Sequence, residues 1–104
     1  MGIEHPLTPV PSLALGTSEV TLLEISSAFA TLANGGIRMV PTGLAAGDPG
    51  VPPLGPLPAS YRAVSAESAF MITHLLRGVM RRGTGAGSSA WGLQDVTAGK
   101  TGTT

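Results

Sequence analysis

The sequence predicts an α+β fold with two main helices and the start of one strand. Two stretches, residues 22–33 and 66–82, repeat apolar residues at helical spacing and carry helix-start and helix-end signals. A third stretch, residues 96–104, is extended in pattern and ends the chain. Between the helices, residues 41–58 hold a large share of the 15 glycines and 9 prolines, so little core can form there.

The composition limits the size of the core. The chain has 104 residues, which suffices for one domain at most. Leu, Val, Ile and Phe together make up 25 of the 104 residues, just above the level at which disorder becomes the better prediction. We therefore expect a thin core built from the two helical stretches.

Charge and cysteine content exclude several classes of function. Six basic and six acidic residues cancel, so no nucleic acid and no anionic membrane surface is expected as a partner. Without Cys there can be no disulfide, thiol catalysis or cysteine-ligated zinc. His5 and His74 have no companions at metal-ligand spacing, so we expect surface or half-buried histidines, no metal site and no cofactor. The chain as written shows neither an export signal nor a membrane anchor.

The first part of the chain is predicted to be an extended lead-in followed by a helix. Residues 1–20 contain three closely spaced prolines and should form an extended connector. Thr21 and Glu24 have the spacing of a reciprocal capping box, which starts a helix over about 22–33. Residues 34–36, Asn-Gly-Gly, supply left-handed conformations to end it. Its expected buried stripe consists of Leu22, Ile25, Phe29 and Leu32.

The middle of the chain, residues 37–64, is predicted to be a hairpin and loop. Residues 37–40 are β-branched at both ends and favour a short strand, with a turn at 48–50. Four prolines in residues 51–58 cannot donate hydrogen bonds, so this part should be a loop.

A second helix is predicted over about 66–82. Ser65 can cap it, Glu67 lies in its first turn, and two arginines lie in its last turn before Gly83. Its expected buried and core residues are Ala69, Phe70, Met71, Ile72, Leu75, Leu76, Val79 and Met80. After it we expect a loop over 83–95 with one helical turn near Trp91, which should pack, and then the strand over 96–104.

The end of the chain contains the residues most suited to binding chemistry. A phosphate-binding loop would need glycine five residues before Gly99, where the chain has Gln94. A dinucleotide-type glycine pattern at 85–90 follows a helix rather than a strand, which favours an ordinary loop. The third interpretation is a carboxylate-binding strand, in which a cation and hydroxyls hold the carboxylate and a glycine lets a peptide lie close. Lys100, Thr101, Gly102 and Thr103 supply these groups.

Four sequence blocks give this third interpretation its context. They are residues 12–21 (SLALGTSEVT), 23–36 with LE and FATLANGG, 83–85 (GTG) and 98–104 (AGKTGTT). In this order and spacing the chain resembles the C-terminal transpeptidase domain of class A (bifunctional) penicillin-binding proteins nearly end to end. The resemblance implies part of the fold shared with serine β-lactamases.

The resemblance also implies an activity and roles for residues. The family cross-links peptidoglycan stem peptides through an acyl-serine intermediate, which β-lactams also form, at the periplasmic face of the plasma membrane. Lys100 with the hydroxyls of Thr101 and Thr103 would bind the carboxylate of the peptide or β-lactam beside Gly102, and the Thr103 amide would be an oxyanion donor. The family's S-x-x-K and S-x-N motifs are absent, because the only lysine is Lys100 and no serine has the second spacing.

We therefore expect a fragment of a serine-type D,D-transpeptidase that is inactive alone and that reaches the membrane only through a missing N-terminal part of its parent. Two alternatives stay open. One is a non-catalytic module that binds a peptide or a partner, and the other, less favoured, is a phosphate-binding protein.

Overall fold

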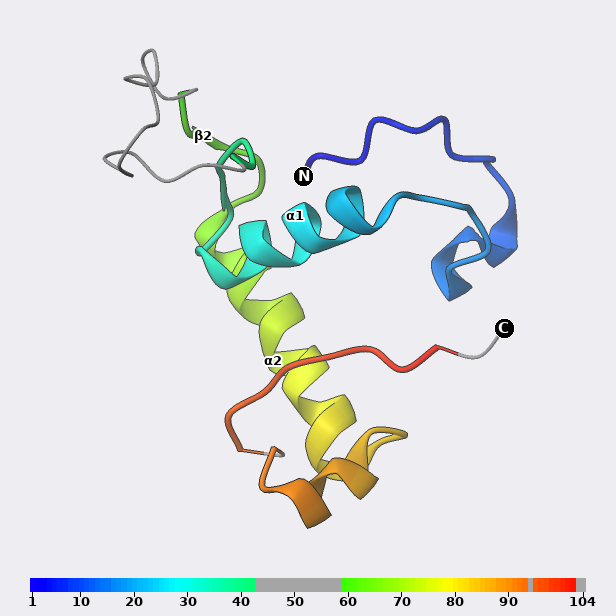
Figure 1. Ribbon diagram of the computed structural model, residues 1–104, viewed down its shortest axis with the longest axis vertical. Coiled ribbons are helices and arrows are strands. Elements are labelled where there is room, and N and C mark those ends of the chain that lie inside the picture. Colours follow the sequence, from blue (N-terminus) through cyan, green and yellow to red (C-terminus); the bar gives the residue numbers. More distant parts are fainter. Residues whose placement is uncertain (43–58, 94, 103–104) are drawn as a thin grey trace, which may run out of the picture.

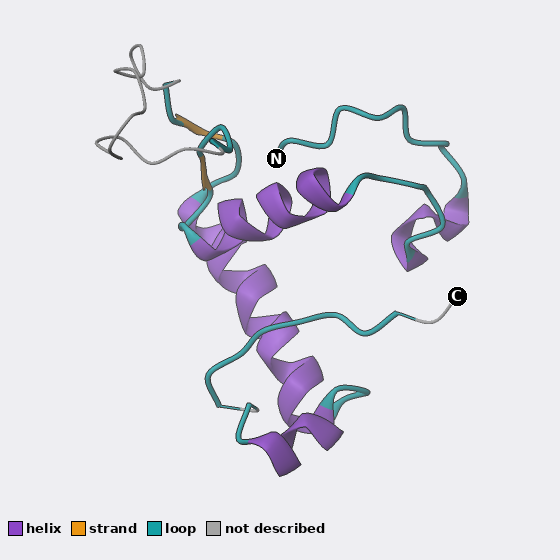
Figure 2. Cartoon of the chain, in the orientation of Figure 1, coloured by secondary structure: helices purple, strands orange, loops and turns teal. Residues whose placement is uncertain are grey.

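The computed structural model describes residues 1–42, 59–93 and 95–102. Its elements follow the chain in the order η1 (Pro11–Leu15), α1 (Leu22–Ala33), β1 (Ile37–Arg38), β2 (Tyr61–Arg62), α2 (Ala66–Arg82) and η2 (Ala86–Trp91). Helices and one two-stranded antiparallel sheet make the described chain an α+β structure, as the sequence predicts (Figure 2). No helix in these ranges is both long and apolar enough to cross a bilayer.

The ends of α1 form as the sequence predicts. The Thr21 hydroxyl accepts from the Glu24 N–H at 3.2 Å, and the Glu24 carboxylate accepts from the Thr21 N–H at 2.8 Å, which completes the capping box. At the other end Gly35 and Gly36 take φ values of 61° and 89°. Asn34 has φ −90°, so only the two glycines are left-handed.

The predicted buried stripe of α1 is wrong in two of its four residues, since only Ile25 and Leu32 are half-buried. Leu22 is 81% exposed and Phe29 37% exposed, whereas Ser27, Ala28 and Thr31 are buried. On the side of α1 toward α2, Phe29, Leu32 and Ala33 border an apolar hollow, whereas Ser27 lies on the side of the lead-in and Arg38. Figure 1 shows the C-terminal end of α1 meeting the N-terminal end of α2, where Ala69 is only 1% exposed.

The helix α2 begins at the Ser65 cap, whose hydroxyl accepts from the Ser68 N–H at 3.1 Å, and it ends at Gly83. Much of its predicted core face is wrong. Described neighbours cover only one side of α2, so several apolar residues that were expected to be buried are exposed. These residues are Phe70, Met71, Ile72 and Leu75, while Leu76, Val79 and Met80 are half-buried.

The sheet pairs Ile37 with Arg62 and Arg38 with Tyr61. This antiparallel pair lies within the hairpin and loop predicted over 37–64, for which no position of the second strand was given, and the predicted turn at 48–50 lies outside the described residues. Gly36 connects α1 to this sheet, because its carbonyl accepts from the Ala63 N–H at 2.9 Å. A Cβ on Gly36 would collide with the Val64 carbonyl oxygen.

Four further expectations differ from the structure. The lead-in is interrupted by η1 at Pro11–Leu15, and η2 is longer than the single turn expected near Trp91. Trp91 is 81% exposed, so it does not pack as predicted. Residues 96–102 form no strand, because no described strand lies beside them to accept and donate the ladder hydrogen bonds. We call residues 96–102 the C-terminal segment.

Candidate functional site

The C-terminal segment is attached to the middle of α2. The Gly99 N–H donates to the Leu76 carbonyl at 3.3 Å, and a Cβ on Gly99 would lie 3.3 Å from the Met80 sulfur. In Figure 1 the segment, coloured orange to red, runs across α2 at this point. The lack of a side chain at Gly99 therefore lets the segment lie against the helix immediately before Lys100.

The turn that follows α2 also contacts this segment. The N–H groups of Gly83 and Gly85 both donate to the Val79 carbonyl at 3.1 Å. A Cβ on the buried Gly85 would lie 2.7 Å from the Met80 sulfur, so Met80 lies between the turn and Gly99. The Thr84 hydroxyl is 2.5 Å from the Thr101 hydroxyl and joins the turn directly to the segment.

The structure brings three of the predicted site residues together in a continuous stretch. Lys100 is exposed, and its ammonium group donates to the Thr101 carbonyl at 2.6 Å. Thr101 is half-buried, and Gly102 is exposed with no atom within 4 Å of where its Cβ would be. Thr103 lies outside the described residues.

Lys100 thus places a positive charge next to the exposed backbone of Gly102. The only hydrogen bond of the Lys100 ammonium to a described residue is to a neighbouring main-chain carbonyl, which an incoming carboxylate could replace with a charge-assisted bond. The open space at Gly102 allows an extended peptide to approach the backbone without a side chain between them. These residues can bind an anion but contain no nucleophile with a neighbouring base.

An apolar hollow of about 280 Å³ adjoins the attachment of the segment to α2. Residues of α1, α2 and the C-terminal segment line it: Phe29, Ala30, Leu32, Ala33, Thr73, Leu76 and Ala98. Ala98 directly precedes Gly99, so the hollow lies beside the stretch that leads to Lys100.

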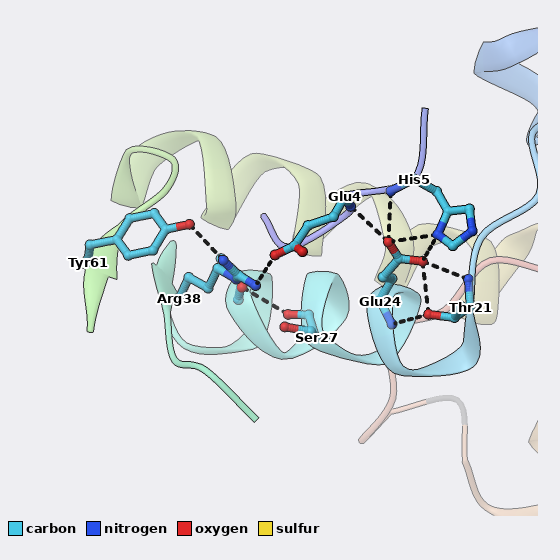
Figure 3. Close-up of polar contacts among 8 residues, drawn as sticks. Glu4, His5, Thr21, Glu24, Ser27, Arg38 and Tyr61 are labelled. Carbon is cyan, nitrogen blue, oxygen red and sulfur yellow. Dashed lines mark hydrogen bonds and ion pairs between the residues drawn. The ribbon is translucent and has the colours of Figure 1, made fainter. Parts of the chain in front are cut away.

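A second polar cluster lies at the other end of α1 (Figure 3). The Glu24 carboxylate accepts from the backbone N–H groups of Glu4 at 2.8 Å and His5 at 2.9 Å, and His5 Nδ1 lies 3.1 Å from it. The backbone N–H of Thr21, followed by those of Glu4 and His5, lowers the pKa of Glu24 well below its usual value. The sequence explains Glu24 as a helix-start acid but gives no sign that it also holds the lead-in.

The sequence also gives little sign of Thr84. Its only signal is its place in the block Gly83-Thr84-Gly85, whereas its contact with Thr101 joins residues 17 positions apart. The structure thus adds Thr84 and Met80 to the residues that surround the predicted site.

Comparisons with known proteins identify the family of the chain. The family model described as penicillin binding protein transpeptidase domain matches residues 8–104. Penicillin-binding protein 1B of Escherichia coli (strain K12) is 36% identical over 100 residues, which cover 94% of this chain and 12% of that protein. Penicillin-binding protein 1A of Neisseria cinerea is 37% identical over 100 residues, which cover 89% of this chain and 12% of that protein. The chain thus spans about 12% of the length of these relatives, and no solved structure matches it.

Proposed function

The chain belongs to the penicillin-binding protein transpeptidase domain family, and we propose that it supplies the substrate-carboxylate site of a class A peptidoglycan-cross-linking D,D-transpeptidase. The reaction is acyl transfer from a peptide ending in D-Ala-D-Ala to a cross-bridge amine, through an ester on a serine. That serine belongs to an S-x-x-K motif outside this chain, because the only lysine here is Lys100. The chain alone is therefore inactive.

Each residue of the proposed site has one task. The Lys100 ammonium and the Thr101 hydroxyl bind the terminal carboxylate of the donor peptide or of a β-lactam. Gly102 lets the peptide backbone lie against the chain. The Thr103 amide donates to the tetrahedral oxyanion, an effect of about 3 kcal/mol in comparable sites.

The observation that carries the proposal is the exposed pair of Lys100 and Gly102 on a segment attached to α2. The attachment through Gly99, Met80 and the Thr84 hydroxyl limits the freedom of the segment, while Lys100 and Gly102 remain exposed. Pre-organisation of this kind reduces the entropy cost of binding.

The structure favours this site over the phosphate-loop alternative. A phosphate loop places its Lys-Thr pair at the start of a helix, where several backbone N–H groups point at the phosphate. Residues 97–102 form no helix, and position 94 is Gln94 rather than glycine. The Lys-Thr pair therefore lacks the helix start that phosphate binding requires.

The substrate fixes the compartment of the proposed activity. Peptidoglycan is assembled outside the plasma membrane, so we place the site on that side, on a parent protein attached to the membrane through a part outside this chain.

The test is a titration of the isotope-labelled chain with acetyl-D-Ala-D-Ala, followed by NMR. We expect amide shifts at residues 100–104 with a dissociation constant in the millimolar range, about 4 kcal/mol of binding. The same peptide with a C-terminal amide should cause no such shifts, because it has no carboxylate for Lys100.

Lys100→Met should abolish these shifts, whereas Arg82→Met, which removes a charge from an exposed part of α2, should leave them unchanged. Equal binding of the amide peptide, or shifts that persist in Lys100→Met, would show that the carboxylate site is elsewhere.

A further inference from the structure

One face of α2 concentrates positive charge. Three of the six basic residues in the chain, Arg77, Arg81 and Arg82, lie within six positions of one another. His74 precedes them by one helical turn, so all four residues share one face of the helix. Together with Gly78 they line a hollow of about 140 Å³, which we call the arginine hollow.

Gly78 is the residue that makes the arginine hollow. It lies inside α2, where glycine is the least favourable residue apart from proline. Its φ is not positive, and no atom of the described residues lies within 4 Å of where its Cβ would be, so neither backbone geometry nor packing within the described chain requires glycine. The effect of the missing side chain is to leave space between the arginines.

The charges around the arginine hollow are only partly balanced. Arg81 forms an ion pair with the Asp95 carboxylate at 3.1 Å, and Arg77 donates to the Asp95 backbone carbonyl at 3.3 Å. The exposed Arg82 side chain makes no ion pair with any residue in the described ranges. Within the described ranges the Asp95 carboxylate pairs with Arg81 alone, so the charges of Arg77 and Arg82 have no carboxylate partner there.

The helix dipole explains only part of this pattern. Basic residues in the last turn are favourable, which accounts for Arg81 and Arg82. Arg77 lies before the last turn, and a favourable dipole interaction gives no reason for a glycine between the arginines. The combination of Arg77, Gly78 and the hollow needs a different explanation.

We propose that the arginine hollow binds a phosphate group. Guanidinium groups match the geometry of oxyanions and hold them through paired hydrogen bonds. A carboxylate offers two oxygens and one charge, which a single arginine satisfies, as Arg81 does for Asp95. A tetrahedral phosphate with more acceptor oxygens and up to two charges can use several guanidinium groups at once, and three are present. This site is separate from Lys100 and does not depend on the proposed transpeptidase function.

The test is a titration of the labelled chain with inorganic phosphate at constant ionic strength, followed by NMR. We expect saturable shifts at Gly78 and the neighbouring arginines. Gly78→Leu keeps every charge, raises helix propensity and fills the hollow, so it should weaken phosphate binding at least about tenfold. Arg62→Gln, which removes a charge elsewhere in the chain, should leave the affinity unchanged. Circular dichroism of each variant checks that α2 is intact.

A second arm identifies the source of the phosphate. Phosphatidylcholine vesicles with and without phosphatidic acid are tested for co-sedimentation with the chain. Binding to phosphatidic acid that inorganic phosphate competes away would support a lipid headgroup as the source, and binding of inorganic phosphate alone would support a soluble one. No saturable phosphate binding, unchanged affinity in Gly78→Leu, or vesicle binding that phosphate cannot compete away would each overturn the proposal.

Discussion

A single carboxylate, that of Glu24, joins three parts of the chain. It completes the cap of α1 and also accepts hydrogen bonds from the backbone of Glu4 and His5 in the lead-in (Figure 3). Nearby, Arg38 donates to the Tyr61 hydroxyl at 2.9 Å and lies 3.6 Å from the Glu4 carboxylate. The lead-in is thus held to α1 and to the sheet by side chains rather than by a hydrophobic core.

The first prediction concerns the pH dependence of this contact. The pKa of Glu24 is lowered in the folded chain, so the carboxylate stabilises the fold above its unfolded value of 4.5 and loses this effect as pH falls below that value. Glu24→Gln should lower the melting temperature at pH 7 and remove much of the loss of stability between about pH 5 and pH 3. Thermal melts of both proteins across this range measure the effect.

Glu19→Gln is the control, because Glu19 is an exposed carboxylate just before the cap and no described residue forms an ion pair with it. A wild-type and a Glu24→Gln chain with the same pH profile would show that Glu24 does not hold the lead-in.

The second prediction concerns Thr84. Thr84→Val removes the hydrogen bond to Thr101 and keeps the side-chain volume nearly constant. The lost hydrogen bond should lower the stability of the contact by about 1 kcal/mol. Amide hydrogen exchange at residues 100–102 should become faster, because the C-terminal segment loses one of its attachments. Thr84→Ser keeps the hydroxyl and should exchange like the wild type. Unchanged exchange in Thr84→Val would contradict a positioning role for this residue.

At this scale the sequence suggests candidate binding residues but not their contacts. Lys100, Thr101 and Gly102 are identifiable because the residues needed for a carboxylate site are adjacent in the chain. The partners of Thr101 and Glu24 are 17 to 20 positions away, and no local pattern encodes such contacts.

At the scale of elements, the ends of the helices are more predictable than their buried faces. Caps depend on residues within one turn, so Thr21, Glu24 and Ser65 identify the starts of α1 and α2. The buried face depends on which neighbour the helix meets. The large residues Leu22 and Phe29 suggest one buried face of α1, but the residues that become buried are the small Ser27, Ala28 and Thr31. The hairpin prediction did not place β2, because a two-residue strand has too short a pattern to be located.

The third prediction uses two adjacent glycines with different surroundings. Gly35 and Gly36 both have positive φ, but only at Gly36 would a Cβ meet another atom, the Val64 carbonyl oxygen. Gly35→Ala should lower the free energy of unfolding by about 1 kcal/mol, because alanine is disfavoured in the left-handed backbone conformation. Gly36→Ala should lower the free energy of unfolding by clearly more, because Val64 must also move away from the new Cβ. Urea unfolding of both variants measures the difference, and equal losses would mean that Val64 does not pack against Gly36.

At the scale of the whole molecule, the described chain is open. The Cα radius of gyration is 16.4 Å, whereas a compact domain of this length has about 13 Å. Many large apolar side chains are exposed, while Ala28 and Ala69 are the buried apolar residues of the described chain. The thin core expected from composition is therefore thinner still in the structure.

The fourth prediction follows from this openness. Little apolar surface is buried to offset the entropy of folding, so the isolated chain should melt broadly and below about 60 °C, where mesophilic domains commonly melt. It should also bind a hydrophobic dye such as ANS before heating. Differential scanning calorimetry provides the measurement. A sharp, cooperative transition above about 60 °C would show that the chain is a stable domain by itself.

The central claim is that this chain supplies the carboxylate-binding part of a transpeptidase site without the nucleophile, and fluorescent penicillin tests it most directly. Acylation requires a serine activated by a neighbouring base, and none of the nine serines has a lysine three residues later. The purified chain, incubated with the reagent and then denatured, should show neither a labelled band nor a mass increase. Labelling should appear when a transpeptidase segment that carries S-x-x-K is co-expressed, and Lys100→Met should reduce it. Stoichiometric labelling of the chain alone, on any of its serines, would contradict the account.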